Sequence, residues 1–300
     1  MTVSRIDLAD AATPEKLVLE ILRHEPDLTI PVPIEDLCRQ LDIVDITPLD
    51  TEGYEGGLIT PVDKFEGSIL YNRLSPRRRR RFTIAHELAH FLMPSHIPSA
   101  DGRFLCRMSD MLALQAGEAD KRLRMEVEAN RFAAHVLMPA PFFRKDVAVG
   151  KDPDLNQLIK LADRYDVSKE AASRAYVRYR DEPVAIVIVH NGKVLRVYRE
   201  QSKFPYLSTG QGSPVSAYSL LRRRKHEEGA PSEIDQTDAG VWLDVQRGQS
   251  PPQLYEQVLA QREGYAMIML SIEPQIDDDD EDPEDGLTSA QRLKRRLSSR

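Results

Sequence analysis

The chain of 300 residues has two cysteines, one tryptophan and no apolar run near the roughly 18 residues that a membrane-spanning helix requires. Its first residues lack the charged-then-apolar layout of a signal peptide, so we expect a cytoplasmic protein with no membrane partner. The cysteines, Cys38 and Cys106, are far apart in apolar contexts, which indicates buried thiols in a reducing compartment. Because no paired cysteine spacing exists, a cysteine-based metal site is excluded as well.

The charge of the chain is concentrated at one end. Residues 277–285 hold eight acidic side chains, and removing these eight charges from the formal net charge of -7 leaves +1. A basic run at residues 292–296 follows. Such blocks indicate a disordered charged tail over residues 277–300. The remaining body is nearly neutral. The whole chain is 41% hydrophobic, which is typical of a globular protein.

Hydrophobic periodicity and Gly/Pro punctuation predict an α+β protein. The predicted helices cover residues 14–25, 34–41, 75–93, 119–137, 155–165, 168–179 and 254–262. The predicted strands cover residues 43–46, 55–60 and 67–71, as an antiparallel sheet, and then 184–189, 193–198, 240–245 and 265–272. An Asn191-Gly192 turn joins two of them as a hairpin. Residues 95–117 are predicted to be irregular.

The motif with the clearest chemistry is His86-Glu87-Leu88-Ala89-His90, inside the predicted helix that ends at Met93-Pro94. Residues four apart on a helix lie about 6 Å apart along the axis and about 40° apart around it, so His86 and His90 can bind one ion. Zinc binds histidine nitrogen and, in catalytic sites, keeps a position open for water. Glu87 is turned so that it can act as the general base towards that water.

The third metal ligand has more than one candidate. His96 stands at the spacing of a three-histidine pattern, although Met93 replaces the turn glycine of that pattern. The stronger candidate is Glu126 on the next long helix, because Asn130 lies four residues later on the same face and can orient a ligand histidine. Glu128 points about 200° away, which is typical of a solvated helix face.

Residues 80–90, RRFTIAHELAH, and residues 126–139, EVEANRFAAHVLMP, closely resemble the two signature segments of the ImmA/IrrE family of metallopeptidases. The resemblance covers roughly residues 30–180. In that family the ligand glutamate precedes the Ala-Asn pair by three positions, which implies Glu126 here. Two departures are Ala89, where glycine is common, and His135, where an acidic or amide residue is common. Neither departure removes a catalytic group.

The resemblance implies a minimal zincin-like (gluzincin) fold with a helix-turn-helix-like pair. We therefore expect a metallopeptidase domain over residues 1–150, the helical pair over 151–182, a smaller α+β module over 183–276 that senses substrate or signal, and the tail over 277–300. The implied function is a zinc-dependent endopeptidase that cleaves a DNA-binding repressor of a phage, mobile element or stress response. The metal ligands would be His86, His90 and Glu126, with Glu87 catalytic, Asn130 supporting them, and no organic cofactor.

The alternative function is a transcription regulator, or a repressor-binding partner, that acts without proteolysis. Residues 158–174 resemble a helix-turn-helix in which Ser168 caps the second helix. The pair offers the basic residues Lys169, Arg174, Arg178 and Arg180, which Asp163, Asp166 and Glu170 offset. Since the body carries almost no net positive charge, DNA contact is not favoured over packing or a substrate groove. The run Arg77–Arg81 is likewise expected to lie mostly on the solvent side of its helix.

Overall fold

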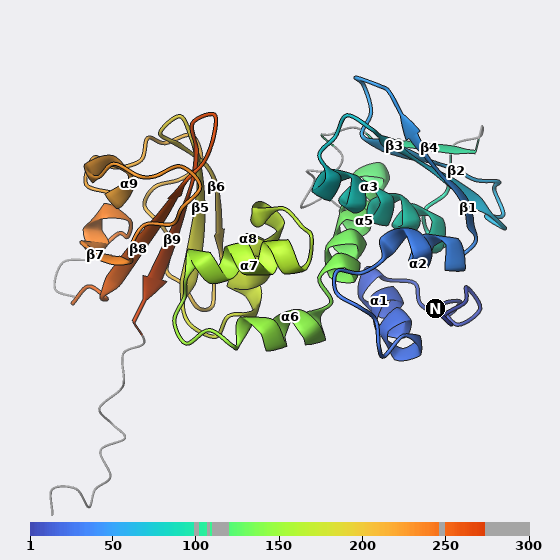
Figure 1. The fold of residues 1–300 in the computed structure, drawn as a ribbon, viewed down its shortest axis with the longest axis horizontal. Coiled ribbons are helices and arrows are strands. Elements are labelled where there is room, and N and C mark those ends of the chain that lie inside the picture. The colour runs from blue at the N-terminus through green and yellow to red at the C-terminus, as the bar shows by residue number, and fades with distance from the viewer. Residues whose placement is uncertain (99–101, 107–108, 110–119, 246–249, 274–300) are drawn as a thin grey trace, which may run out of the picture.

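The computed structural model describes residues 1–98, 102–106, 109, 120–245 and 250–273. Figure 1 shows an amino-terminal lobe and a carboxy-terminal lobe, with helices α6 (Ala140–Val147), α7 (Leu155–Arg164) and α8 (Lys169–Tyr179) between them. Helices and two separate sheets confirm the predicted α+β class. The predicted tail, residues 277–300, lies outside the described residues. Among the described helices, none combines the length and hydrophobicity that a bilayer crossing requires.

The amino-terminal lobe packs helices against one mixed sheet. Its helices are α1 (Pro14–His24), α2 (Ile34–Gln40), α3 (Arg77–Leu92) and α5 (Lys121–Leu137), and its strands are β1 (Ile43–Leu49), β2 (Gly56–Ile59), β3 (Gly67–Asn72) and β4 (Arg103–Cys106). The strand order is β1-β3-β2-β4, with β1 parallel to β3 and the other pairs antiparallel. The predicted antiparallel pairing holds for β2 with β3 and is wrong for β1, which runs parallel to β3 because β3 takes the place between β1 and β2.

Helix α3 is held firmly at its carboxyl end. Its backbone stops at the Met93 cap, before Pro94, as predicted from the proline. The buried ammonium of Lys64 donates to the carbonyl oxygens of His90 at 2.7 Å and Met93 at 2.8 Å, and so satisfies groups that the helix end leaves without partners. Burial lowers the pKa of Lys64 to about 8. The last turn of α3, which carries His90, is thus fixed in place.

Helix α5 packs directly on α3. The contact uses small side chains, since Ala85 and Ala89 of α3 and Ala129 and Ala133 of α5 are fully buried. Small residues at a helix crossing let the two backbones approach closely. The side chains that both helices direct at each other therefore meet in a confined, dry space.

The carboxy-terminal lobe is a five-stranded antiparallel sheet in the order β6-β5-β9-β8-β7. Its elements are β5 (Val184–His190), β6 (Lys193–Arg199), α9 (Leu220–Arg223), β7 (Asp235–Thr237), the short 3-10 helix η1 (Ala239–Val241), β8 (Leu254–Ala260) and β9 (Tyr265–Ile272). Helices α7 and α8 cover one face, and Trp242 and Phe204 are buried in the core on the other. The Asn191-Gly192 hairpin is confirmed, and β5 is apolar from Val184 to Val189 because both of its faces are buried there.

Two predictions in this lobe are wrong. Residues 254–260 form strand β8 rather than a helix, because inward polar groups find partners there: Glu256 accepts hydrogen bonds from Ser219 and from Trp242 Nε1, and Gln257 accepts one from Leu155 N. Because Glu256 and Gln257 are polar, the sequence of β8 lacks the apolar pattern by which a buried strand is predicted. The predicted strand at residues 240–245 contains the end of η1 and only an isolated bridge at Leu243. Helices α6 and α9 and strands β4 and β7 were not predicted, and β4 corrects the expectation that residues 95–117 are irregular.

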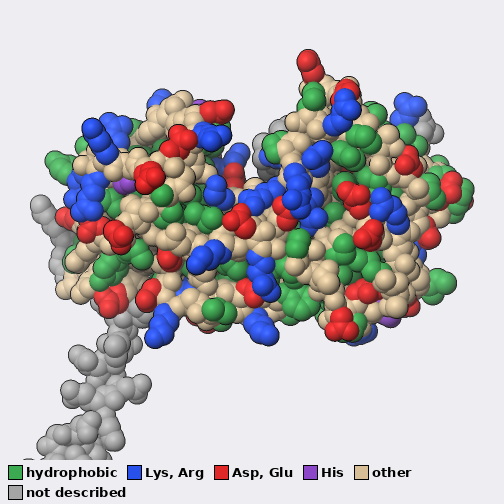
Figure 2. Space-filling view, viewed as in Figure 1, with side chains coloured by type: hydrophobic (Ala, Val, Ile, Leu, Met, Phe, Trp, Pro, Cys, Tyr) green, Lys and Arg blue, Asp and Glu red, His purple; other side chains and the backbone are tan. Residues whose placement is uncertain are grey.

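Three arginines of the run on α3 form ion pairs with helix α7 and the turn between α7 and α8, and of these the Arg77 side chain is still 72% exposed, whereas that of Arg81 is 15% exposed. Arg77 and Arg81 each place a nitrogen within 3.1 Å of Asp166, in the turn between α7 and α8, and Arg78 lies 2.5 Å from Asp163. The Asp166 side chain is 10% exposed and that of Asp163 is 64% exposed. Figure 2 shows Lys and Arg side chains gathered around the notch where the lobes meet.

We expect Asp166→Asn to destabilise the chain by about 1–3 kcal/mol, because it leaves the largely buried guanidinium of Arg81 without its carboxylate. Asparagine keeps the shape and tolerates the left-handed backbone of this residue, with φ of 51°. Asp163→Asn is the matched control and should cost about 0.5 kcal/mol or less, because that ion pair is solvated. Urea unfolding of both variants measures the difference. Equal losses would contradict the assignment of Asp166 as the connecting residue.

One face of the second helix of the helical pair is covered by protein, whereas Arg174 and Arg178 on its other face are exposed. Helix α8 packs against β5 and β6, and Glu170 on its first turn accepts hydrogen bonds from Arg196 and Tyr198. Arg180, one of the basic residues considered for DNA contact, is 2% exposed. A helix that reads DNA must present its side chains to the groove. The packing of α8 on the sheet therefore favours the structural role that the sequence indicated.

Candidate metal centre

The helical turn of α3 that carries the motif is completely buried. His86, Glu87 and His90 all have 0% exposed surface. The Nε2 atoms of His86 and His90 lie 3.1 Å apart, so both rings direct the same nitrogen at one point. This is the convergence that the four-residue spacing predicts for two histidines on one helix face.

Glu126 reaches the same point from α5. One of its carboxylate oxygens lies 3.2 Å from His86 Nε2 and 3.5 Å from His90 Nε2. Burial alone raises the pKa of Glu126, but hydrogen bonds with His86 and His90 outweigh that effect and hold it well below its usual range. Burial lowers the pKa of His90 to about 3. A carboxylate and a neutral imidazole are the forms in which these groups bind metals.

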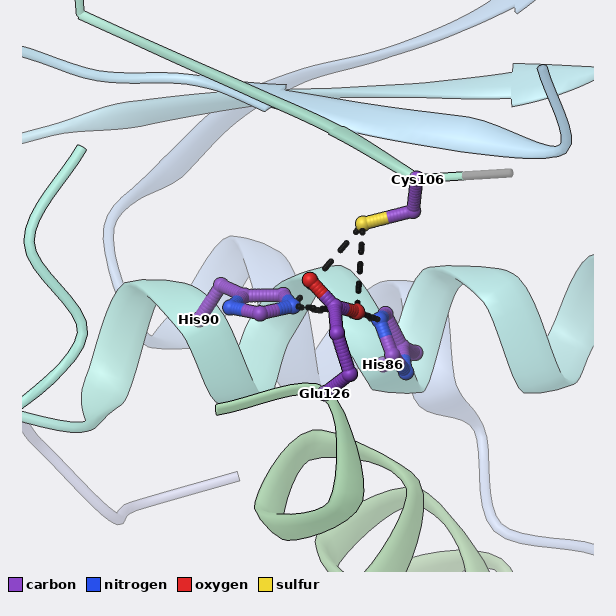
Figure 3. Close-up of side chains that lie close together, drawn as sticks. All are labelled: His86, His90, Cys106 and Glu126. Carbon is purple, nitrogen blue, oxygen red and sulfur yellow. Dashed lines mark hydrogen bonds and ion pairs between the residues drawn. The ribbon is translucent and has the colours of Figure 1, made fainter. Parts of the chain in front are cut away.

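A fourth donor, Cys106 at the end of β4, completes the group. Its Sγ lies 3.8 Å from both His90 Nε2 and Glu126 Oε2, and Figure 3 shows it directed at the carboxylate from the strand above the helices. The ligand atoms of His86, His90, Cys106 and Glu126 all lie within 4.8 Å of one another. The prediction that cysteine takes no part in a metal site is therefore wrong. The spacing between pairs of cysteines detects only metal sites that use several cysteines, and this cluster has one.

The dimensions of this cluster fit a tetrahedral metal. Ligands at zinc distances of 2.0 to 2.3 Å stand about 3.3–3.6 Å from each other at the corners of a tetrahedron. Five of the six separations between donor atoms run from 3.1 to 3.8 Å, and the sixth, between His86 and Cys106, is within 4.8 Å. Two imidazoles, a carboxylate and a thiol are also a donor set that zinc accepts. The residues present therefore fit the metal that the motif implies.

Asn130 lies behind the first histidine, on the same face of α5 as Glu126. Its Oδ1 lies 3.0 Å from His86 Nδ1. An amide oxygen only accepts, so His86 carries its proton on Nδ1 and Nε2 is left for the metal. A partner of this kind fixes the tautomer and the orientation of a ligand histidine.

His96 lies behind the second histidine and not at the point where the donors meet. Its Nδ1 is 3.0 Å from His90 Nδ1, and its Nε2 is 3.0 Å from Glu128 Oε2. If His90 Nδ1–H donates to His96, the Nε2–H of His96 donates to Glu128, and His90 Nε2 remains free for a metal. The structure thus separates His96 from the cluster. Glu128, which the sequence indicated as a solvated residue, accepts the last hydrogen bond in this series from His90 through His96.

Glu87 faces strand β2 from the helix. A Cβ atom added at Gly56 of β2 would lie 3.1 Å from Glu87 Oε1 and 2.2 Å from the methyl carbon of Thr83. Only glycine therefore allows β2 to pass this close to α3 and Glu87. The candidate general base therefore lies against the strand that runs past the motif helix.

The comparisons with known proteins agree with this site. Residues 38–176 match the model of peptidase family M78, the IrrE N-terminal-like domain. Among solved structures, a Mycobacterium tuberculosis transcriptional regulator is similar at a TM-score of 0.48 and 14% identity, over 89% of this chain and 92% of that chain. No curated protein matches the sequence. The matched segment contains His86, His90 and Glu126, so residues 38–176 are similar to the M78 domain of the ImmA/IrrE family, which has a zincin-like fold.

Proposed function

We propose that this chain is a zinc-dependent endopeptidase that cleaves a cytoplasmic protein. The observation that carries the proposal is the meeting of His86 Nε2, His90 Nε2 and a Glu126 oxygen, 3.1 to 3.5 Å apart, beside Glu87. Two histidines and one carboxylate on the metal, with a glutamate next to the first histidine, are typical of zinc peptidases. The set lies inside a domain of a metallopeptidase family.

In this mechanism His86, His90 and Glu126 hold the metal, and Glu87 moves the proton. When bound, zinc supplies Lewis-acid polarisation of the scissile carbonyl and of a water molecule. Glu87 accepts a proton from that water as it attacks, and delivers the proton to the amine nitrogen as the C–N bond breaks. Asn130 keeps the His86 ring in its tautomer through the contact with Nδ1.

As the substrate we propose a helix-turn-helix repressor of a phage, a mobile element or a stress response, which is the class that the family resemblance implies. We propose with it the domain division in which catalysis lies in residues 1–150, the helical pair in 151–182 packs between the lobes, and residues 183–276 sense substrate or signal. One face of α8 packs on the carboxy-terminal sheet, while Arg174 and Arg178 stay exposed on the other, so we propose packing or a substrate groove as the role of the pair and do not favour a DNA groove.

The test is prolonged incubation of the zinc-loaded full chain with purified repressors encoded beside its gene, followed by mass spectrometry of the products. We expect one repressor to yield two fragments that meet at a single bond, and no fragments with the metal removed by a chelator. A repressor that binds the chain tightly and stays intact with zinc present would contradict the proposal, and would favour the partner that acts without proteolysis.

A further inference from the structure

Strand β4 lies along the sheet edge nearest to the candidate general base. It pairs antiparallel with β2, Cys106 opposite Gly56 and Phe104 opposite Leu58, and Glu55 N donates to Cys106 O at 3.0 Å. Extended peptides bind proteins by adding a strand to an available edge. Since Gly56 is the point where β2 passes Glu87, the edge that β4 occupies is where a peptide would lie to bring its bond to Glu87.

The side chains of β4 alternate between solvent and the metal centre. Arg103 and Leu105 are exposed, whereas Phe104 and Cys106 are 8% and 1% exposed. The Phe104 ring stacks on His90 with 4.7 Å between ring centroids, and the Cys106 thiol joins the donor cluster, as Figure 3 shows. The two inward residues of β4 therefore have separate contacts: Phe104 covers the ligand His90, and Cys106 supplies the fourth donor of the cluster.

A metal bound by four protein groups has no position left for water, which distinguishes closed structural sites from open catalytic ones. The zero exposure of His86, Glu87 and His90 agrees with a closed site. We propose that Cys106 is the fourth metal ligand and that β4 occupies the peptide-binding edge of β2, so that the chain inhibits itself until a protein substrate displaces both. This inference rests on the proposed peptidase function. Coordination of Cys106 releases the thiol proton to solvent, and displacement takes one back.

The first test is the absorption spectrum of the full chain loaded with Co²⁺ in place of zinc. We expect the near-ultraviolet band of a thiolate bound to cobalt in the wild type and in Cys38→Ser, because Cys38 is buried in the core away from the cluster. Cys106→Ser should lose the band while its visible bands report bound cobalt. A wild-type chain with bound cobalt and no thiolate band overturns the assignment, whether or not any protein is cleaved.

The second test asks whether Cys106 competes with a ligand at the open position. The probe is a dipeptide hydroxamate, which binds metals through two oxygens and needs no cleavage. We expect it to abolish the thiolate band of the wild type, and to bind cobalt-loaded Cys106→Ser at least about tenfold more tightly, because the wild type binds only from its open fraction. Equal affinities for the two chains would overturn the self-inhibition. Cleavage of a repressor at equal rates would also do so, and absent cleavage would count only against the peptidase function.

Discussion

Glu87→Gln is expected to lower the rate of peptide cleavage at least about 100-fold, because it removes the only proton acceptor that the mechanism uses. Glutamine has the same shape and fits the space between α3 and Gly56, where a glutamate oxygen lies 3.1 Å from the position of an added Cβ. Glu87 does not belong to the donor cluster, so metal content should be unchanged.

The measurement is the cleavage rate per bound zinc, taken in the wild type and again with Cys106→Ser present in both chains. The second comparison removes the thiol that we propose as the inhibitory ligand, and so raises the reference rate. Metal analysis and the melting temperature of each variant are the controls. Cleavage by Glu87→Gln at the rate of its parent would show that another group moves the proton.

Glu126→Ala is expected to lower zinc affinity by more than about 100-fold and to abolish cleavage, because it removes a carboxylate that contacts both ligand histidines. Changes to groups that only orient a ligand typically cost 10- to 100-fold in metal affinity. His96→Ala and Glu128→Ala should fall in that smaller range, since both act through His90 Nδ1. Equilibrium titration with a zinc-buffering chelator measures all three.

The comparison decides between the two candidates for the third ligand. Zinc binding that survives Glu126→Ala and disappears in His96→Ala would show that the helix-face argument and the family mapping are both mistaken. Glu128→Ala also tests whether Glu128 supports the metal site or is only a solvated surface residue. The sequence indicated a solvated side chain, for which metal affinity should not change, whereas the 3.0 Å contact with His96 Nε2 predicts a measurable loss.

The helical periodicity of the sequence predicted much of the candidate site. His86, Glu87 and His90 lie on one helix, so their relative positions follow from 3.6 residues per turn and need no other part of the chain. The same holds for Glu126 and Asn130, which α5 places on one face. Helix ends at proline and the hairpin at Asn191-Gly192 are also local, and the structure has all of these elements where the pattern predicts them.

Tertiary structure alone decided which distant segments join those helices. Cys106 reaches the site through β4, and no spacing in the sequence relates it to His90. The spacing of His96 suggested a direct metal ligand, whereas the fold places it behind His90. The parallel pairing of β1 with β3 and the strand at residues 254–260 have the same origin, since strand partners are chosen by long-range contacts. A helix repeats its geometry at every turn, so its faces can be read from the sequence, whereas a sheet edge and the thiol that it carries exist only once the chain has folded.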